Sequence, residues 1–311
     1  MLLLNQQHDV IGLDDLNEFY DTRLKQHRLH VLEEYRSFHF LRLNITNSDA
    51  LTEAVRRLDT PAAVLHLAAR PGVRQSVSEP CACFETNVTG TIHLLEFCRS
   101  RSVKKFLLAS SSSVYGAQRQ LPYTEDCESS LPLSPYAASK KAAEALCHSY
   151  HYLYGFDVSI LRYFTVYGPA GRPDMSVFRF IQRIYEGAPI SIYGDGSQRR
   201  DFTYVDDVAC ATVMAINKVG YSILNIGSDN PASVLNVLNL IEEIAGRKSL
   251  VRYCPPSSAD VPATWANISK ASHILGWKPQ TCCKQGLGAA CEWYRANREW
   301  ARQVSTSDDQ F

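Results

Sequence analysis

Residues 105–116 read KFLLASSSSVYG. The expected strand, 105–109, carries a continuous apolar run at 106–109 rather than an alternating pattern, which is typical of a strand buried on both faces. Consecutive serines at 110–113 follow where that strand should end. In open α/β sheets, ligands bind outside the carboxyl ends of the strands, so the serine run is a candidate part of a functional site.

Short apolar runs alternate with longer amphipathic stretches through the first half of the chain. We expect strands at 9–13, 38–43, 63–67, 105–109 and 158–161, and helices at 22–35, 48–58, 84–100 and 135–154. Such alternation predicts a parallel sheet with helices on both faces. With right-handed crossovers, the fold class is α/β, a Rossmann-like doubly wound sheet.

The sequence pattern changes after Arg162, where loops rich in glycine and proline separate shorter predicted helices and strands. We therefore expect a dinucleotide-binding domain over 1–165 and a smaller α/β domain over 166–285, parts of which return to the first domain. A helical tail should occupy 286–311. A ligand would then lie in the cleft between the two domains.

Composition and charge narrow the class of protein. Lys+Arg and Asp+Glu are both 32, which argues against a nucleic-acid partner held by phosphate neutralisation. No apolar run approaches the ~20 residues that span a bilayer, and the first residues lack the features of a signal peptide, so we expect a cytoplasmic protein without a membrane partner. The ten cysteines form no C-x-x-C pair, so we expect buried thiols and no metal site.

The pattern Tyr136-x-x-x-Lys140 opens one predicted helix. Its spacing places both side chains on one face, with Ser134 at the N-cap and Pro135 in the first turn. A nearby ammonium favours the phenolate, so we expect the pKa of Tyr136 to lie below its ordinary value and the phenol to accept a proton from a hydroxyl. Taken alone the pattern is weak, because Tyr and Lys four residues apart are common on exposed helix faces.

Five further blocks follow in a fixed order along the chain. They are GLDDLN at 12–17, HLAARPGVR at 66–74, NVTG at 87–90, RYFTVYGP at 162–169 and RRDFTYVDD at 199–207. Together with the serine run and the Tyr-x-x-x-Lys pattern, they resemble the extended short-chain dehydrogenase/reductase family of NAD-dependent epimerases and dehydratases, which act on nucleotide sugars. Within that family the chain is most similar to the UDP-glucuronate 4-epimerase group, from residue 1 to about 280.

The resemblance implies the catalytic and cofactor-binding residues. The catalytic set is Ser111, Tyr136 and Lys140, and the cofactor is NAD. Asp14 matches the acid that binds the adenosine ribose, where a carboxylate favours NAD over NADP. The cofactor-binding residues are Asp14, Asn17, Asn44, Ile45, Leu67, Ala68, Ala69, Asn87, Tyr136, Lys140, Tyr163 and Val166.

The resemblance also implies the substrate-binding residues Arg74, Ser111, Ser112, Thr165, Arg172, Tyr193 and Arg200. Arg172 lies in a GRPDM segment similar to the uronate epimerase loop, and its guanidinium is suited to bind a carboxylate through two parallel hydrogen bonds. Ser112 and Ser113 stand where related dehydratases carry Asp-Glu and related decarboxylases carry a Glu. The chain therefore lacks the acidic side chain that the related enzymes use for elimination or decarboxylation.

The implied activity is C4 inversion of UDP-glucuronate to UDP-galacturonate through a 4-keto intermediate, as an isomerase of polysaccharide biosynthesis. Two alternatives remain. One is a UDP-N-acetylglucosamine or UDP-glucose 4-epimerase, and the other is a catalytically impaired nucleotide-sugar-binding paralogue. Members of the family usually dimerise through two helices, so we expect a homodimer formed by 84–100 and 135–154.

The N-terminal region departs from the family pattern. The sixteen glycines include no G-x-G-x-x-G or G-x-x-G-x-x-G, and the family places that fingerprint about 20 residues before the strand-ending acid. Met1–Gln7 resembles the second half of the family's first helix. We therefore expect the first strand and its glycine-rich loop, which holds the pyrophosphate at a helix N-terminus, to be absent. This predicts an incomplete sheet and weak NAD affinity.

Overall fold

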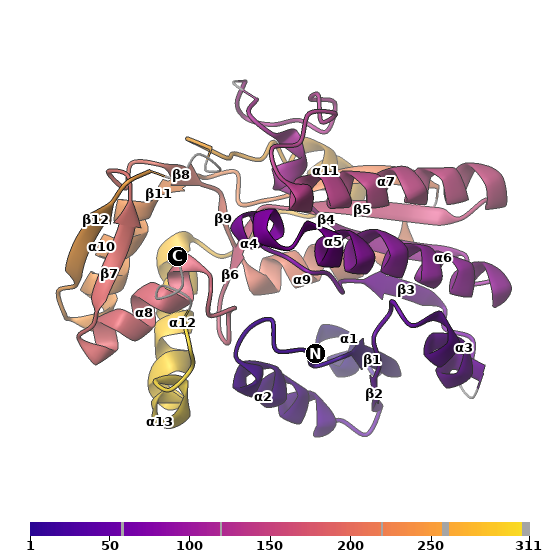
Figure 1. The fold of residues 1–311 in the computed structure, drawn as a ribbon, viewed down its shortest axis with the longest axis horizontal. Coiled ribbons are helices and arrows are strands. Elements are labelled where there is room, and N and C mark those ends of the chain that lie inside the picture. The colour runs from indigo at the N-terminus through magenta and orange to yellow at the C-terminus, as the bar shows by residue number, and fades with distance from the viewer. Residues whose placement is uncertain (57–58, 119, 219, 257–260, 307–311) are drawn as a thin grey trace.

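The central element of the fold is a four-stranded parallel sheet in the order β10 (Tyr221–Ile226), β5 (Asp157–Tyr163), β4 (Lys105–Ser111) and β3 (Ala63–His66) (Figure 1). The computed structural model describes residues 1–56, 59–118, 120–218, 220–256 and 261–306. Every residue of β4 is buried, as its continuous apolar run predicts. The sheet therefore places the serine run at the carboxyl end of a central strand.

The strands β1 (Val10–Asp14) and β2 (Phe38–Arg42) form a second, separate parallel sheet. In the described part of the chain, neither strand pairs with the four-stranded sheet. Asp14 ends β1, as expected, and lies opposite Arg42 in the register. The described strands of the N-terminal half therefore form two separate parallel sheets.

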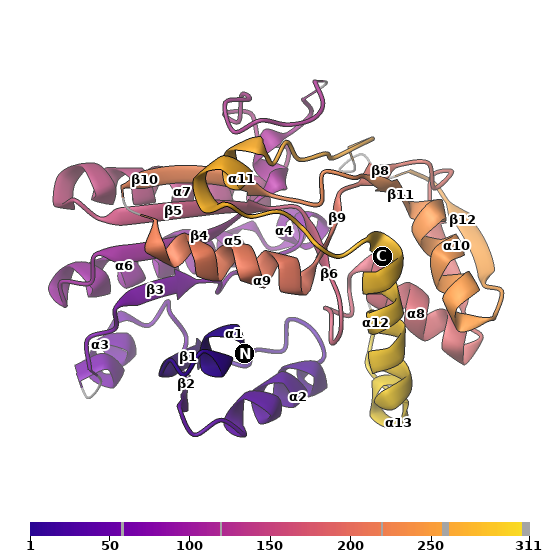
Figure 2. The same cartoon turned by 180° about the vertical axis from the view of Figure 1, so that it is seen from behind.

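Helices cover both faces of the four-stranded sheet, and the alternation of side chains along β4 sends them to different cores. Phe106 and Leu108 pack with residues of α6 (Gly90–Ser100) and α7 (Pro135–Tyr154). Leu107 packs on the opposite face with residues of α9 (Val205–Met214) and α11 (Ser269–Leu275). Figures 1 and 2 show these two helical layers from opposite sides, and the doubly wound α/β arrangement is confirmed.

The N-terminal helices are α1 (Leu2–Asn5), α2 (Thr22–Glu33) and α3 (Ser48–Arg56). Asp21 caps α2 by accepting a hydrogen bond from the Arg23 amide. Helix α1 contacts α9. The helix expected at 48–58 is α3, and its last two expected residues lie outside the described residues.

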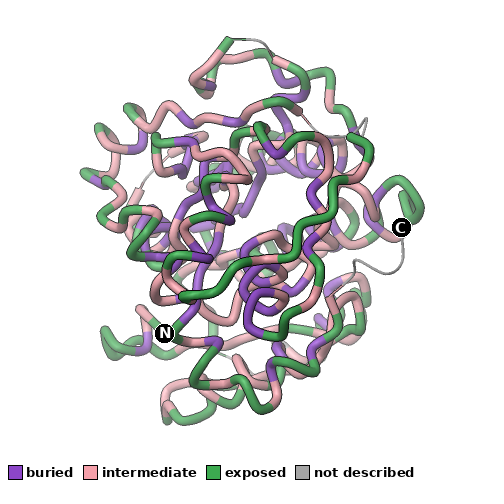
Figure 3. Tube along the Cα trace, turned by 90° about the vertical axis from the view of Figure 1, so that its left-hand side faces the viewer, coloured by how far each residue is buried: buried purple, intermediate pink, exposed green. Residues whose placement is uncertain are grey.

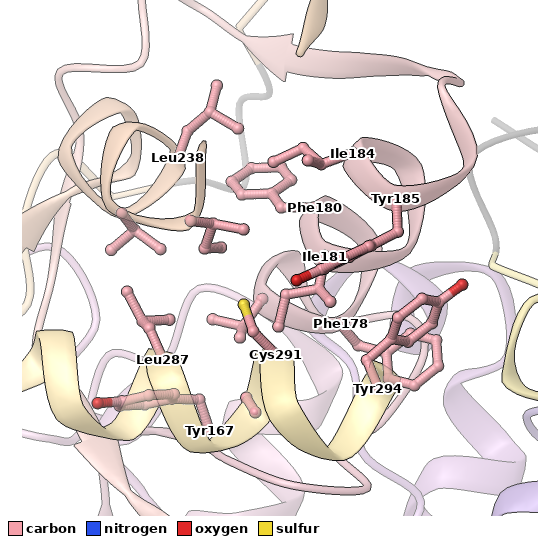
Figure 4. Packing of buried hydrophobic residues seen from close by; sticks show 14 of the residues in the cluster. Tyr167, Phe178, Phe180, Ile181, Ile184, Tyr185, Leu238, Leu287, Cys291 and Tyr294 are labelled. Carbon is pink, nitrogen blue, oxygen red and sulfur yellow. The ribbon is translucent and has the colours of Figure 1, made fainter. Parts of the chain in front are cut away.

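The C-terminal part has its own hydrophobic core. Helices α8 (Ser176–Glu186), α10 (Val234–Ala245) and α12 (Cys283–Ala296) pack together, and Figure 4 shows their apolar side chains interlocking. The strands β7 (Pro189–Tyr193) and β12 (Leu250–Cys254) form a parallel pair beside them. The last helix is α13 (Arg298–Ala301), and residues 307–311 of the expected tail are not among those described.

Shorter elements complete the described structure. They are α4 (Val73–Ser78), α5 (Pro80–Phe84), the π-helix η1 (Glu85–Thr89), the 3-10 helices η2 (Ser112–Tyr115) and η3 (Ala215–Asn217), and the strands β6 (Thr165–Tyr167), β8 (Arg199–Arg200), β9 (Phe202–Tyr204) and β11 (Ala232–Ser233). β6 pairs with β9, and β8 pairs with β11. Leu24 of α2 belongs to the same core as α8 and α12, so that core also reaches the N-terminal region.

Burial follows this layering. Figure 3 shows buried segments running through the interior of the chain trace, with exposed segments outside. All ten cysteines are free thiols, but only Cys83, Cys98, Cys147 and Cys291 are buried, so the expectation of buried thiols is wrong for the other six. Within the described ranges, no three or more His, Cys, Asp or Glu residues gather as a metal site would require. A search of the same ranges for a helix long and apolar enough to cross a bilayer finds none.

Candidate active site

Ser111 is the last residue of β4 and the N-cap of η2. Its Oγ accepts a hydrogen bond from the Ser113 amide and donates one to the Ser113 hydroxyl, both at 3.2 Å. In the sheet register it lies opposite Tyr163 of β5. The serine hydroxyl therefore stands at the carboxyl end of a buried strand, where the sequence placed it.

Tyr136 and Lys140 lie in the first turns of α7. The Ser134 hydroxyl caps this helix by accepting from the Ala137 amide at 3.1 Å, and Pro135 occupies the first turn, so the predicted helix start is confirmed. Lys140 is 4% exposed, and its Nζ donates to the main-chain oxygen of Ala109 on β4 at 2.8 Å. Strand β4 and helix α7 thus bring the predicted catalytic side chains together.

The electrostatics of Tyr136 differ from the sequence-based expectation. Burial raises the pKa of the Tyr136 phenol, while a hydrogen bond with Ser111 and the positive charge of Arg172 act to lower it. The expected lowering of that pKa by Lys140 is wrong for this structure, because desolvation outweighs the favourable contacts. Burial also lowers the pKa of Lys140 to about 8, against the opposing effects of Cys83, Glu144 and Cys147.

The adenosine side of the expected cofactor site lies around β1 and β3. The Asp14 carboxylate is half exposed, accepts from the Leu16 amide at 2.7 Å and lies 3.7 Å from Lys25 Nζ. Leu67, directly after β3, is 58% exposed although it is large and apolar. The exposed Asp14 carboxylate fits the ribose hydroxyls of NAD. The exposed apolar side chain of Leu67 fits one of its planar rings.

The remaining residues on that side are largely engaged within the protein. Asn17 Oδ1 accepts from Phe19 and Lys25, and Asn44 Oδ1 accepts from Thr46. Ile45 is buried, and its main-chain oxygen contacts His93 Nδ1 at 2.9 Å. No residue of a glycine-rich phosphate loop can be assigned, because the sequence carries no such fingerprint.

Asn87 fixes the loop that follows β3. Its Oδ1 accepts from the Arg70 amide at 2.7 Å, and its Nδ2 donates to the Arg70 carbonyl and to Ser139 of α7, at 3.1 and 2.9 Å. Asn87 therefore connects the loop that follows Ala68 and Ala69 to helix α7. The Tyr163 hydroxyl is 2.7 Å from the Thr212 hydroxyl, and Val166 packs against the core under α9, so both of these expected cofactor residues also have structural partners.

The expected substrate residues come from several elements. The Arg172 guanidinium binds Asp174 through two contacts, Nε to Oδ1 at 3.0 Å and Nη2 to Oδ2 at 2.6 Å. The Arg172 guanidinium, which the sequence analysis assigned to a substrate carboxylate, is therefore already bound to the carboxylate of Asp174. Arg172 and Thr165 line one pocket.

Two other expected substrate-binding residues, which are far apart in the sequence, are in contact in the structure. The Arg74 guanidinium of α4 lies 4.2 Å from the centre of the Tyr193 ring at the end of β7. Arg200 lies on β8 opposite Ala232. Ser112 begins η2 directly beside Ser111. The cation–π contact brings together two residues that the sequence analysis could only list separately.

Two groups of functional interest were missed by sequence reasoning. Glu144 and Arg162 form a buried ion pair beneath the serine run, and the Ser110 hydroxyl donates to Glu144 at 2.6 Å. Asp201, fully buried, accepts from Ser228 Oγ at 2.7 Å and from the Ala266 amide at 3.0 Å. The one available signal was the spacing of Glu144, which follows Lys140 by four residues and so shares its helix face.

Comparison with known proteins agrees with this geometry. Residues 1–227 match the model of the NAD dependent epimerase/dehydratase family. A UDP-glucuronate 4-epimerase of Thermodesulfobacterium geofontis is 46% identical over 303 residues, which cover 97% of this chain and 93% of that protein.

Solved structures of the same kind are similar throughout. The UDP-glucuronic acid 4-epimerase of Bacillus cereus, in complex with UDP-glucuronic acid and NAD, is 37% identical with a TM-score of 0.88, covering 95% of this chain and 94% of that one. The UDP-glucose 4-epimerase of Thermotoga maritima, with UDP-glucose, is 31% identical with a TM-score of 0.88, covering 96% and 94%. By sequence, fold and the residues at the end of β4, the chain belongs to the NAD dependent epimerase/dehydratase family.

Proposed function

We propose that this chain is an NAD-dependent nucleotide-sugar 4-epimerase that converts UDP-glucuronate to UDP-galacturonate. The observation that carries the proposal is the meeting of Ser111 at the end of β4 with Tyr136 and Lys140 of α7, next to the charge of Arg172. The names of similar proteins support the choice of substrate, since both a sequence relative and a solved structure are UDP-glucuronate 4-epimerases.

The residues suit a proton transfer at C4 of the sugar. Bound NAD would supply the acceptor and donor of hydride at that carbon. The Ser111 hydroxyl would hold the C4 oxygen by a hydrogen bond while Tyr136, as the phenolate, accepts the proton of that oxygen and becomes the phenol. Lys140 would keep a positive charge beside the developing phenolate, which favours that proton transfer electrostatically.

Inversion then requires the keto sugar to turn within the site. We propose that the sugar rotates about its diphosphate linkage while Arg200 holds the diphosphate and Arg74 and Tyr193 flank the nucleotide side. Tyr136 returns the proton to the oxygen of the inverted carbon. The hydroxyls of Ser112 and Ser113 offer no acid to promote elimination.

A second candidate substrate is UDP-glucose, and one contact favours it. Arg172 is already paired with Asp174, so a neutral sugar would not need to compete for that guanidinium. Incubation of the purified protein with UDP-glucuronate, UDP-glucose and UDP-N-acetylglucosamine, with separation of the products, tests both proposals. Turnover of UDP-glucuronate alone supports the first, and turnover of UDP-glucose at higher kcat/KM supports the second.

We also propose the assembly and setting that the family resemblance implies. A homodimer would form through α6 and α7, and α7 carries the exposed side chains of Tyr152 and Leu153 near its end. The chain would divide into domains at 1–165 and 166–285, with the tail 286–311, and would act in the cytoplasm in polysaccharide biosynthesis. Light scattering coupled to gel filtration tests the dimer.

A further inference from the structure

A buried carboxylate lies directly beneath the candidate active site. Glu144 is 2% exposed and accepts hydrogen bonds from Arg162 Nε at 2.9 Å and Arg162 Nη2 at 2.8 Å. Arg162 is 1% exposed. Because desolvation of two charges is costly and an apolar pair often packs equally well, stability alone does not account for such a pair.

Two turns of α7 are fastened to two consecutive residues of β4. Lys140 Nζ donates to the Ala109 carbonyl at 2.8 Å, and one turn later Glu144 accepts from the Ser110 hydroxyl at 2.6 Å. Ser111 is the next residue of the strand. These hydrogen bonds oppose both sliding and rotation of α7 along β4. Tyr136 lies one turn before Lys140 on the same helix.

Arg162 anchors Glu144 from the neighbouring strand. It lies opposite Ser110 in the β4–β5 register, and its guanidinium is 4.8 Å from the centre of the Tyr115 ring. The Tyr115 hydroxyl in turn donates to Asn225 Oδ1 of β10 at 2.6 Å. The pair therefore contacts Ser110 and Tyr115, which flank the segment 111–114 that contains the reactive serine.

Several titratable side chains around Glu144 face the Lys140 ammonium and influence its pKa. On its own helix, Glu144 and Cys147 face the ammonium, while Cys83 of α5 and His66 of β3 approach from neighbouring elements. His66 stays neutral, because burial first and Lys140 second lower its pKa to about 3. Burial acts to raise the pKa of Glu144, but hydrogen bonding and charge from Arg162 hold it below its usual value, so Glu144 is ionised.

We propose that Glu144 and Arg162 are positioning residues of the epimerase. Together they tie α7 to β4, so that Tyr136 and Lys140 stay aligned with Ser111, and they place a fixed negative charge one turn from the lysine. The inference rests on the proposed function, since the alignment matters only if Tyr136, Lys140 and Ser111 act together on a sugar hydroxyl. It assigns a role to two residues that are buried beneath the candidate site.

The first test is the Glu144→Gln variant, which keeps the size of the side chain and removes its charge. We expect kcat to fall about 10- to 100-fold with KM changed less than about twofold, because misalignment affects the transition state rather than binding. The alkaline limb of the kcat profile should move to lower pH by about 1 unit, since loss of a nearby carboxylate lowers the pKa of Lys140.

Two further variants separate this role from a purely structural one. Lys141→Met removes a second cation 3.4 Å from Glu144 but leaves the carboxylate, so kcat and the pH profile should stay as in the wild type. The double variant Glu144→Gln with Arg162→Met leaves no buried charge unpaired and should fold where the single variant fails. It should still lose kcat, and wild-type kcat and pH dependence in this variant would overturn the proposal.

A measurement without turnover distinguishes this inference from the proposed function. Lysine labelled with ¹³C at Cε reports the titration of Lys140 by NMR, with the Lys140→Met spectrum giving the assignment. In Glu144→Gln the midpoint should move to lower pH, whether or not the protein converts any nucleotide sugar. An unchanged midpoint would refute the electrostatic role even if epimerase activity is present, while a moved midpoint without activity would refute only the proposed function.

Discussion

Lys140 donates a 2.8 Å hydrogen bond to the main-chain oxygen of Ala109, and this contact joins helix α7 to strand β4. The ammonium is buried and bound to a carbonyl that cannot move away from the sheet. A hydrogen bond from a charged donor to a buried acceptor is among the stronger ones in proteins. The geometry therefore fixes a positive charge near the end of β4, where the Ser111 hydroxyl lies.

Replacement of this lysine should abolish most of the activity. We expect Lys140→Met to lower kcat by about 10²- to 10⁴-fold, the range typical of a lost acid–base partner. Product formation from UDP-glucuronate, measured by chromatography, checks this. The neighbouring Lys141→Met variant is the matched control, and an equal loss in both variants would show that the effect is not specific to the site.

Activity should fall as the pH rises through about 8, where burial places the pKa of Lys140. Below that pH the ammonium is charged and supports the Tyr136 phenolate. Because the folded-state pKa lies below the ordinary value of 10.5, the unfolded chain holds this proton more tightly between about 8 and 10.5, so the Lys140 contribution to the free energy of unfolding rises with pH. The loss of activity should therefore be reversible, with an unchanged circular dichroism spectrum, and unfolding across that window would contradict the prediction.

Arg172→Ala should discriminate between acidic and neutral sugars. If the guanidinium leaves Asp174 to bind the substrate carboxylate, the variant should raise KM for UDP-glucuronate by about 10-fold or more and change KM for UDP-glucose little. Asp174→Asn should lower KM for UDP-glucuronate, because it removes the carboxylate that pairs with Arg172 within the protein. Steady-state kinetics with both substrates decide the matter, and equal effects on both would remove Arg172 from the choice of substrate.

Ser111→Ala should reduce both turnover and local stability. The hydroxyl contacts Tyr136 and also caps η2, and loss of an N-cap costs about 1 kcal/mol. We expect kcat to fall about 10- to 100-fold from loss of the hydrogen bond to the reacting oxygen. Ser111→Thr keeps both hydroxyl functions and should retain most activity. A wild-type rate in Ser111→Ala would exclude the serine from the reaction.

The sequence predicted well those features that depend on residues near one another in the chain. The predicted start of α7 was correct because Ser134 and Pro135 satisfy the first turn locally. The start of β4 was also correct because its apolar run is continuous, although the strand extends beyond the expected end at 109 to Ser111. The spacing of Tyr136 and Lys140 follows from the helical period alone. The doubly wound α/β class required only alternation of elements and the handedness of their crossovers.

Other features were decided by tertiary structure, because burial and distant partners set them. The direction of the Tyr136 pKa shift depends on desolvation that no local pattern reports. Lys140 binds Ala109, 31 residues away, and Glu144 binds Arg162, 18 residues away. The sequence by itself determined which side chains are available and on which faces they lie. Only packing decided which charges meet and which are removed from water, since electrostatic energy depends on distance and solvent exposure rather than on order along the chain.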